Sequence, residues 1–196
     1  MFIAETWADE VGPDIVQRNI DFEHKWVVMK EGRGGGIALF WKASVNLEVV
    51  DSSNYYIDTC IDKDTDNEWH FIGFHREPTT SRRSEVWDNL ITLNHNLEVP
   101  WLCEGDFNEL TRQEEKLGGA ARNHGQMQLF KDVLDECGFM DLGFVGSQFT
   151  WSKHFADGHS IWEILDHGLA NNSWFTKFLG SIVTHLLDRE ARLWSQ

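Results

Sequence analysis

Two amphipathic segments flank a short apolar run, and this arrangement limits the fold more than any other feature of the chain. The first segment has apolar residues at helical intervals and stops before Pro100, namely Val86, Leu90, Leu93 and Leu97. The second has a capping-box-like start, an apolar stripe and a final glycine: Asn123, Gln126, Met127, Phe130, Leu134, Cys137 and Gly138. With a strand expected at residues 101–106 between the two helices, the sequence predicts an α/β domain.

Short β-rich runs, separated by Gly, Asn, Asp and Ser, occupy the first part of the chain at residues 27–29, 37–41, 47–50, 55–61 and 69–74. They predict a β-meander. Further strands are expected at residues 149–151, 161–165 and 182–186, with a short helix at 172–178. No Pro-rich or Gly/Ser-rich linker and no internal repeat divides the 196 residues, so we expect one domain with a substantial core.

The charge balance opposes nonspecific attraction to a polyanion, because 17 Lys and Arg stand against 32 Asp and Glu, a net charge of -15. Binding to DNA would therefore need a local basic patch. The candidates are Arg82, Arg83, Arg112, Lys116, Arg122 and Lys177. A scattered, solvated set of basic residues is the alternative interpretation.

The cysteines and the apolar segments indicate the cellular compartment in which such a chain is expected. Cys60, Cys103 and Cys137 are odd in number and lack the paired short spacing of a zinc site, so we expect reduced core residues without a disulfide partner. No apolar run is long enough to span a bilayer, and residues 1–4 are too short for a signal-peptide core. An intracellular protein is expected, in the nucleus or the cytoplasm, while the oligomeric state stays open.

Two polar side chains at the end of the 101–106 run carry the clearest chemistry. If the strand alternation continues, Asp106 and Asn108 point to one side while Phe107 anchors in the core. An ionised Asp can orient and deprotonate a water, and an Asn amide can donate to a phosphate oxygen without adding negative charge. The alternative is a strand followed by an Asx-type turn.

The chain resembles the endonuclease/exonuclease/phosphatase superfamily, in particular the endonuclease domains of plant non-LTR retrotransposons of the long interspersed (LINE) type. The matching segments occur in family order and comprise residues 5–7, 34–38, 71–74, 81–83, 105–108, 115–119, 141–144, 149–151 and 165–166. The resemblance implies a two-sheet, four-layer α/β sandwich over residues 1–187, incomplete at both ends, followed by a divergent tail at 188–196.

The resemblance also implies roles for site residues and a cofactor. Glu5 would hold Mg²⁺, or Mn²⁺ in its place, and hard cations of this kind bind through one or two carboxylates. Asp106 would align the attacking water, Asn108 would contact the phosphate, and Asp166 would orient a catalytic His. Residues expected near the substrate are Arg82, Arg83, Thr150 and Trp151, with core packing as the alternative for Trp151.

Several positions depart from the family pattern. His75 stands where relatives have Tyr; it can bind a phosphate but titrates near neutrality, and an exposed loop His is the alternative. Ile164 and His167 stand where relatives have Arg. The N-terminal strand that supplies an active-site Asn and the C-terminal Ser-Asp-His are missing, and His185, the last His, matches an ordinary position in relatives. These losses predict a weak or inactive enzyme.

The resemblance therefore implies a Mg²⁺-dependent phosphodiester hydrolase, derived from a retrotransposon and acting on DNA, whose intact parent would nick DNA to start reverse transcription. Three alternatives stay open. The first is a noncatalytic remnant that binds a partner or nucleic acid. The second is a phosphatase or phospholipid-headgroup hydrolase of the same superfamily. A carbohydrate-binding or glycosidic protein is a weaker alternative, suggested by ten Trp residues and many carboxylates.

Overall fold

The computed structural model describes residues 1–4, 12–29, 36–75, 83–93 and 98–186. Its largest element is a six-stranded sheet in the order β4-β5-β6-β7-β13-β9. Its strands are β4 (Leu47–Ser52), β5 (Tyr56–Ile61), β6 (Trp69–His75), β7 (Trp101–Asp106), β13 (Asp166–Ala170) and β9 (Met140–Asp141). Within this sheet only β6 and β7 pair in parallel, because α2 (Arg83–Leu93) carries the chain back between them.

A second, smaller sheet packs against the large one. It has the order β1-β3-β2, formed by β1 (Phe2–Ile3), β3 (Ile37–Trp41) and β2 (His24–Val28). The predicted β-meander is therefore only partly correct: β4, β5 and β6 form one, but the runs at 27–29 and 37–41 belong to the other sheet. Ile37, Leu39 and Ile57 form the buried centre between the two sheets.

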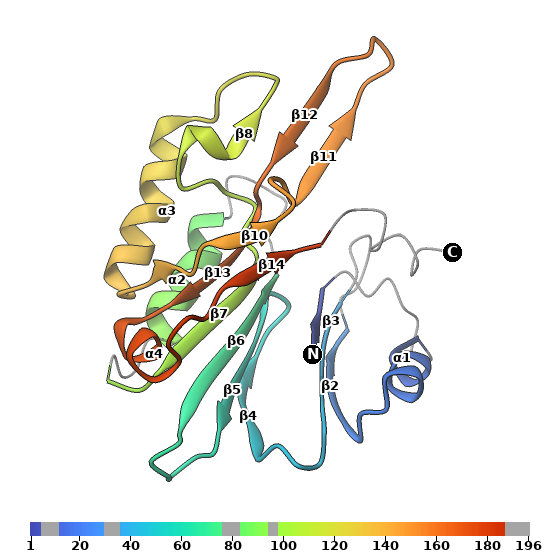
Figure 1. The fold of residues 1–196 in the computed structure, drawn as a ribbon, viewed down its shortest axis with the longest axis vertical. Helices are drawn as coiled ribbons and strands as arrows, with labels where there is room; N and C mark the ends of the chain where they lie inside the picture. The colour runs from blue at the N-terminus through green and yellow to red at the C-terminus, as the bar shows by residue number, and fades with distance from the viewer. Residues whose placement is uncertain (5–11, 30–35, 76–82, 94–97, 187–196) are drawn as a thin grey trace.

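Helices cover the outer faces, which gives the layered sandwich in Figure 1. On the large sheet, α2 and α3 (His124–Glu136) bury Trp87, Leu90, Phe130 and Leu134 against strand residues such as Phe74. The small helix α4 (Asn172–Lys177) follows β13, and α1 (Gly12–Ile20) lies beyond the small sheet (Figure 1). The two-sheet α/β sandwich expected from the sequence is confirmed.

Two minor sheets complete the described structure. One has the order β11-β12-β8, with β11 (Trp151–His154), β12 (Ser160–Glu163) and β8 (Lys116–Leu117), and the other pairs β10 (Phe144–Gly146) with β14 (Val183–His185) in parallel. A 3₁₀ turn, Gln113–Glu115, precedes β8. Among the described residues, no helix is long and apolar enough to cross a membrane.

Candidate active site

Three predicted site residues form one row across the large sheet. In the parallel pair β6–β7, His75 lies opposite Asp106, and in the antiparallel pair β7–β13, Asp106 lies opposite Asp166. Residues directly opposite one another on neighbouring strands project from the same face of a sheet. The fold therefore brings together three residues that are widely separated in the sequence.

Two members of this row, Asp106 and Asp166, border a cavity of about 890 Å³ between the two sheets. Asp106, Asp166 and Thr150 line it, together with Glu104 and His185, and the small sheet contributes an apolar wall that includes Leu39 and Phe40. Its size is within the usual range for small-molecule sites. His75 is only 3% exposed and is not part of the cavity lining, so the prediction of an exposed loop His at this position is wrong.

The turn after β7 differs from the expected strand alternation. Strand β7 ends at Asp106, and Asn108 has a left-handed backbone with φ of 55°. The Asp106 Oδ1 atom accepts the Asn108 backbone N–H at 2.8 Å, which is an Asx-type turn. The prediction that Asp106 and Asn108 share a side by strand periodicity therefore fails, whereas Phe107 is buried as expected, stacked on Phe74 at a centroid distance of 4.8 Å.

Backbone contacts hold this turn next to Asp166. The Phe107 N–H donates to the Leu165 carbonyl at 2.9 Å. The Thr150 hydroxyl accepts the N–H groups of Leu165 and Asp166, at 2.9 and 3.2 Å. Thr150 is thus a positioning residue for Asp166, a role that needs a contact between segments and has no sequence signal.

Several carboxylates gather at this end of the cavity. Glu104 precedes Asp106 by two residues on β7 and therefore shares its face. Desolvation on the cavity wall, and secondarily the charge of Asp166, raise the pKa of Glu104 above its ordinary value. Carboxylate oxygens are the ligands of hard divalent cations, and a cation would relieve this repulsion. The donor chemistry of the described residues therefore fits Mg²⁺ or Mn²⁺.

His167, which faces the helices, is a residue whose role the sequence did not reveal. Its Nδ1 lies 3.1 Å from Asp141 Oδ2 and its Nε2 lies 3.1 Å from the Glu109 carbonyl oxygen. Both partners can only accept, so both ring nitrogens must donate and the ring is an imidazolium. Burial opposes this charge, but the hydrogen bond to Asp141 and nearby carboxylates outweigh it and raise the pKa of His167. His167 is therefore held in its charged form mainly by Asp141.

His185 lies on the cavity wall, although its place in the sequence suggested no function. Its Nδ1 lies 3.0 Å from the Ser147 carbonyl oxygen, and its ring stacks on Phe144 at 4.2 Å. Since a carbonyl only accepts, Nδ1 carries a proton and Nε2 is available as an acceptor when the ring is neutral. His185 is therefore a candidate acid or base that lines the same cavity as Asp166.

The basic residues of α2 and the β8 region form an internal network in place of an open patch. Arg83 is buried and lies 3.2 Å from Glu109, and Arg122 contacts Glu109 and Glu163 at 3.3 and 3.1 Å. Lys116 donates to Glu163 as well. This burial corrects the expectation that Arg83 contacts a substrate from the surface, because its guanidinium neutralises a fully buried carboxylate.

The remaining predicted residues have varied placements. Arg112 pairs with Glu115 at 3.2 Å, and Lys177 donates to the carbonyls of residues 66 and 68, so neither joins a patch with the others. Trp151 is half-buried and packs against Leu110, Met127 and Leu165, as its core alternative expected. Glu5 and Arg82 lie outside the described residues, and their predicted roles stay predictions.

The architecture is that of the endonuclease/exonuclease/phosphatase sandwich, as solved structures show. An AP endonuclease from Archaeoglobus fulgidus aligns with a TM-score of 0.61 and 14% identity, over 87% of this chain and 75% of that chain. The endonuclease domain of TRAS1, a telomere-specific non-LTR retrotransposon, aligns with a TM-score of 0.58 and 11% identity, over 86% and 80%. A beta toxin variant from Staphylococcus aureus with bound magnesium ions aligns with a TM-score of 0.53 and 19% identity, over 88% and 70%.

At these identities the likeness establishes the fold alone. No protein-family model matches the sequence, and no curated protein matches it. The function must therefore be argued from the site.

Proposed function

We propose that this chain is a phosphodiester hydrolase domain that uses a divalent cation and acts on DNA, derived from a retrotransposon of the non-LTR type. The observation that carries the proposal is the register row of His75, Asp106 and Asp166, two of which border the inter-sheet cavity. The shared fold with structures described as endonucleases supports it. So does the family-like sequence around Asp106.

The proposed reaction is hydrolysis by water. The water oxygen forms a bond to phosphorus, its proton passes to the Asp106 carboxylate, and one phosphorus–oxygen ester bond breaks. Asp106 is suited to orient that water because one of its carboxylate oxygens is already fixed by the Asn108 N–H. The leaving oxygen needs a proton, and His185, on the wall of the same cavity, is the described imidazole that we assign to this step.

The cation would be held by Asp166, with Glu5 as the further ligand that the resemblance implies, while Asp106 is kept for the attacking water. When bound, Mg²⁺ or Mn²⁺ would neutralise phosphate charge and polarise the phosphoryl group. Thr150 contributes indirectly, because its hydroxyl fixes the backbone of Asp166.

Hydrolysis of small phosphate esters, including phospholipid headgroups, is the second candidate. It is favoured by the charge distribution: Arg83, Arg122 and Lys116 are engaged by buried Glu109 and Glu163. Cations already neutralised within the protein attract a long polyanion weakly. A small ester would need only the row of residues at the cavity.

The test is nicking of supercoiled plasmid with and without Mg²⁺, using wild type, Asp106→Asn and the matched surface variant Asp157→Asn. The amide at position 106 preserves the acceptor for the Asn108 N–H and removes the base, so we expect a loss of about 10²–10⁴-fold. Asp157 is exposed in the β11–β12 hairpin, and its variant should nick like wild type. His185→Gln should also lose activity if His185 supplies the proton.

Release of phosphate from small esters without nicking would favour the second candidate. Equal background activity in all folded proteins, with both classes of substrate, would overturn the catalytic proposal and leave the noncatalytic alternative.

A further inference from the structure

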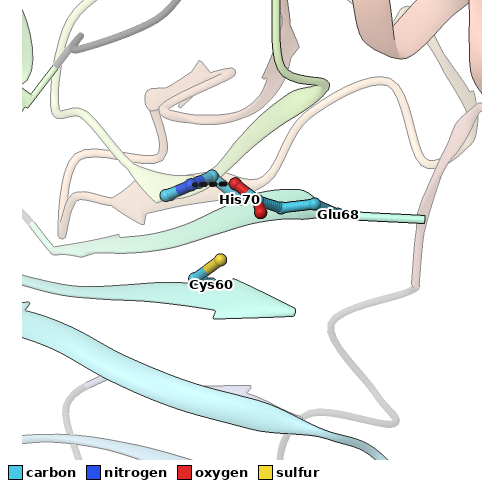
Figure 2. Close-up of side chains that lie close together, drawn as sticks. All are labelled: Cys60, Glu68 and His70. Carbon is cyan, nitrogen blue, oxygen red and sulfur yellow. Dashed lines mark ion pairs between the residues drawn. The ribbon is translucent and has the colours of Figure 1, made fainter. Parts of the chain in front are cut away.

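A mixed set of metal-binding side chains lies on the large sheet, at the end of β6 remote from His75. Cys60 on β5 is directly opposite His70 on β6, so both side chains project from one face, and Glu68 immediately precedes β6. Each of the three residues offers one ligand atom, and these atoms all lie within 4.8 Å of one another. Figure 2 shows Cys60 on its strand and the side chains of Glu68 and His70 close to it.

The Glu68 carboxylate is held in place by its surroundings. Its Oε2 atom accepts the Asp64 N–H at 2.7 Å, which leaves Oε1 directed toward His70, 3.8 Å from Nε2. The Glu68 backbone is fixed on both sides, because its N–H donates to Thr65 and its carbonyl accepts from Lys177. One carboxylate oxygen is thus oriented toward the imidazole before any ligand binds.

A buried carboxylate behind His70 gives independent support. Asp58 is 2% exposed, and its Oδ1 atom has no hydrogen-bond partner among the described residues. His70 Nδ1 lies 3.8 Å from this oxygen. A buried carboxylate oxygen without a donor is costly, and this cost falls when an adjacent imidazole is fixed with its proton on Nδ1. Binding of an ion at Nε2 would fix that tautomer.

We propose that Cys60, Glu68 and His70 bind a divalent transition-metal ion of the zinc class, with Asp58 as the carboxylate that orients His70. Sulfur, imidazole nitrogen and carboxylate oxygen are the ligand set that zinc accepts, whereas magnesium takes oxygen alone. The thiol proton passes to solvent when sulfur binds the ion. Three protein ligands leave a fourth tetrahedral position for water.

The ligand atoms need only a small contraction to close on an ion. Bond lengths of about 2.0–2.3 Å place tetrahedral ligands about 3.3–3.8 Å apart, against the present limit of 4.8 Å. Rotation of the partly exposed His70 side chain can supply the difference, while Glu68 and Cys60 stay in place.

The site would act as a clip on the β5–β6 hairpin. It joins the end of β5 to the start of β6, across the acidic loop at residues 62–67. His70 and His75 are five residues apart on β6, which is about 17 Å along a strand. The clip is therefore separate from the proposed catalytic cation, and it can be tested without any activity assay.

The test is titration of the reduced, metal-free protein with Co²⁺ alone, followed by absorption spectroscopy. We expect a near-ultraviolet thiolate-to-cobalt band with visible bands of a four-coordinate ion. The thiolate band should vanish in Cys60→Ser, binding should weaken by at least tenfold in His70→Gln, and Asp58→Asn should weaken it about 10–100-fold. His124→Gln, an exposed His at the start of α3, is the matched control and should bind like wild type.

Zn²⁺ should displace Co²⁺ and raise the Tm of wild type but not of His70→Gln. Circular dichroism checks that each variant is folded, and His70→Gln carries the test if the buried Cys60→Ser variant does not fold. Absence of the thiolate band in folded wild type would overturn the proposal, as would an undiminished band in His70→Gln or in folded Cys60→Ser.

Discussion

At the scale of single residues, His167 shows how a buried charge links stability to pH. Burial opposes its charge, but the hydrogen bond to Asp141 and nearby carboxylates raise the pKa of His167 above the ordinary value of 6.5. A raised pKa means that the folded state holds a proton which the unfolded state releases. The stabilisation is therefore fully present below about pH 6.5 and is lost as pH rises through the folded-state pKa.

The variant His167→Leu should lower the free energy of unfolding by about 1–3 kcal/mol at pH 6, because the Glu109 carbonyl loses its donor. The difference from wild type should shrink as pH rises toward 9. Urea unfolding of both proteins at several pH values measures it, with His124→Gln as the exposed control. A difference that stays constant or grows with pH would show that His167 is not an imidazolium.

For Asp141, the carboxylate partner of His167, the contribution to stability changes with pH in the opposite direction. Partial desolvation alone would raise the pKa of Asp141, but the hydrogen bonds from His167 and from the Gly143 N–H lower it below its ordinary value. Its contribution to stability is present above the unfolded-state pKa and is lost as pH falls through the lower folded-state value. The pair therefore stabilises the fold most strongly above the ordinary pKa of Asp141, 3.8, and below the ordinary pKa of His167, 6.5.

Whether the role of a residue could be predicted from the sequence depends on how close its partners are along the chain. Phe107 could be predicted as a core residue because its apolar side chain follows a buried strand. Thr150 and His167 could not, since one acts on the backbone of a segment 15 residues away and the other on residues from β9 and the turn after β7. Arg83 looked like a surface cation because the sequence does not show that Glu109 lies beneath it.

At the scale of elements, β7 depends on a glycine. Gly105 has φ of 149°, and a Cβ atom there would lie 1.8 Å from the Phe74 carbonyl oxygen on β6. The obstruction is backbone, so it cannot be relieved by a side-chain rotation. An added methyl group would push β6 and β7 apart at the pair that aligns His75 with Asp106.

We expect Gly105→Ala to destabilise the fold by more than the roughly 1–3 kcal/mol of backbone strain alone. Gly158→Ala is the matched control: it also has positive φ, 89°, but nothing lies within 4 Å of its Cβ position. Thermal unfolding of both variants gives the comparison. If the two variants lose equal stability, the close approach of β6 and β7 at Gly105 is not a constraint on the fold.

Elements with strong local signals were predictable. The start of α3 is an example, since Asn123 accepts the N–H groups of Gly125 and Gln126 as its position before an apolar stripe suggested. The strand β13 was missed because Asp166 and His167 break the apolar pattern, and their places are set by pairing with β7. The division of the early strands between two sheets was also hidden, since periodicity does not state which strands pair.

At the scale of the whole molecule, the sign of the charge sets how the protein can meet a polyanion. The net charge is -15, and the network around Glu109 and Glu163 neutralises Arg83, Arg122 and Lys116 internally. Each phosphate neutralised by a protein cation contributes about -0.9 to the slope of log affinity against log salt. With a net charge of -15 and these three cations engaged internally, the protein should therefore show a shallow slope.

We expect the Asp106→Asn protein, which should bind without cleaving, to give a slope of about -3 or shallower, equivalent to roughly three phosphate contacts. Fluorescence anisotropy of a labelled duplex over a range of KCl concentrations measures it at fixed Mg²⁺. Lys116→Gln, if folded, should leave the slope unchanged because Lys116 is held by Glu163. A slope near -6 or steeper would mean that a basic surface outside this network engages the DNA, and it would restore the open basic patch that the described residues do not form.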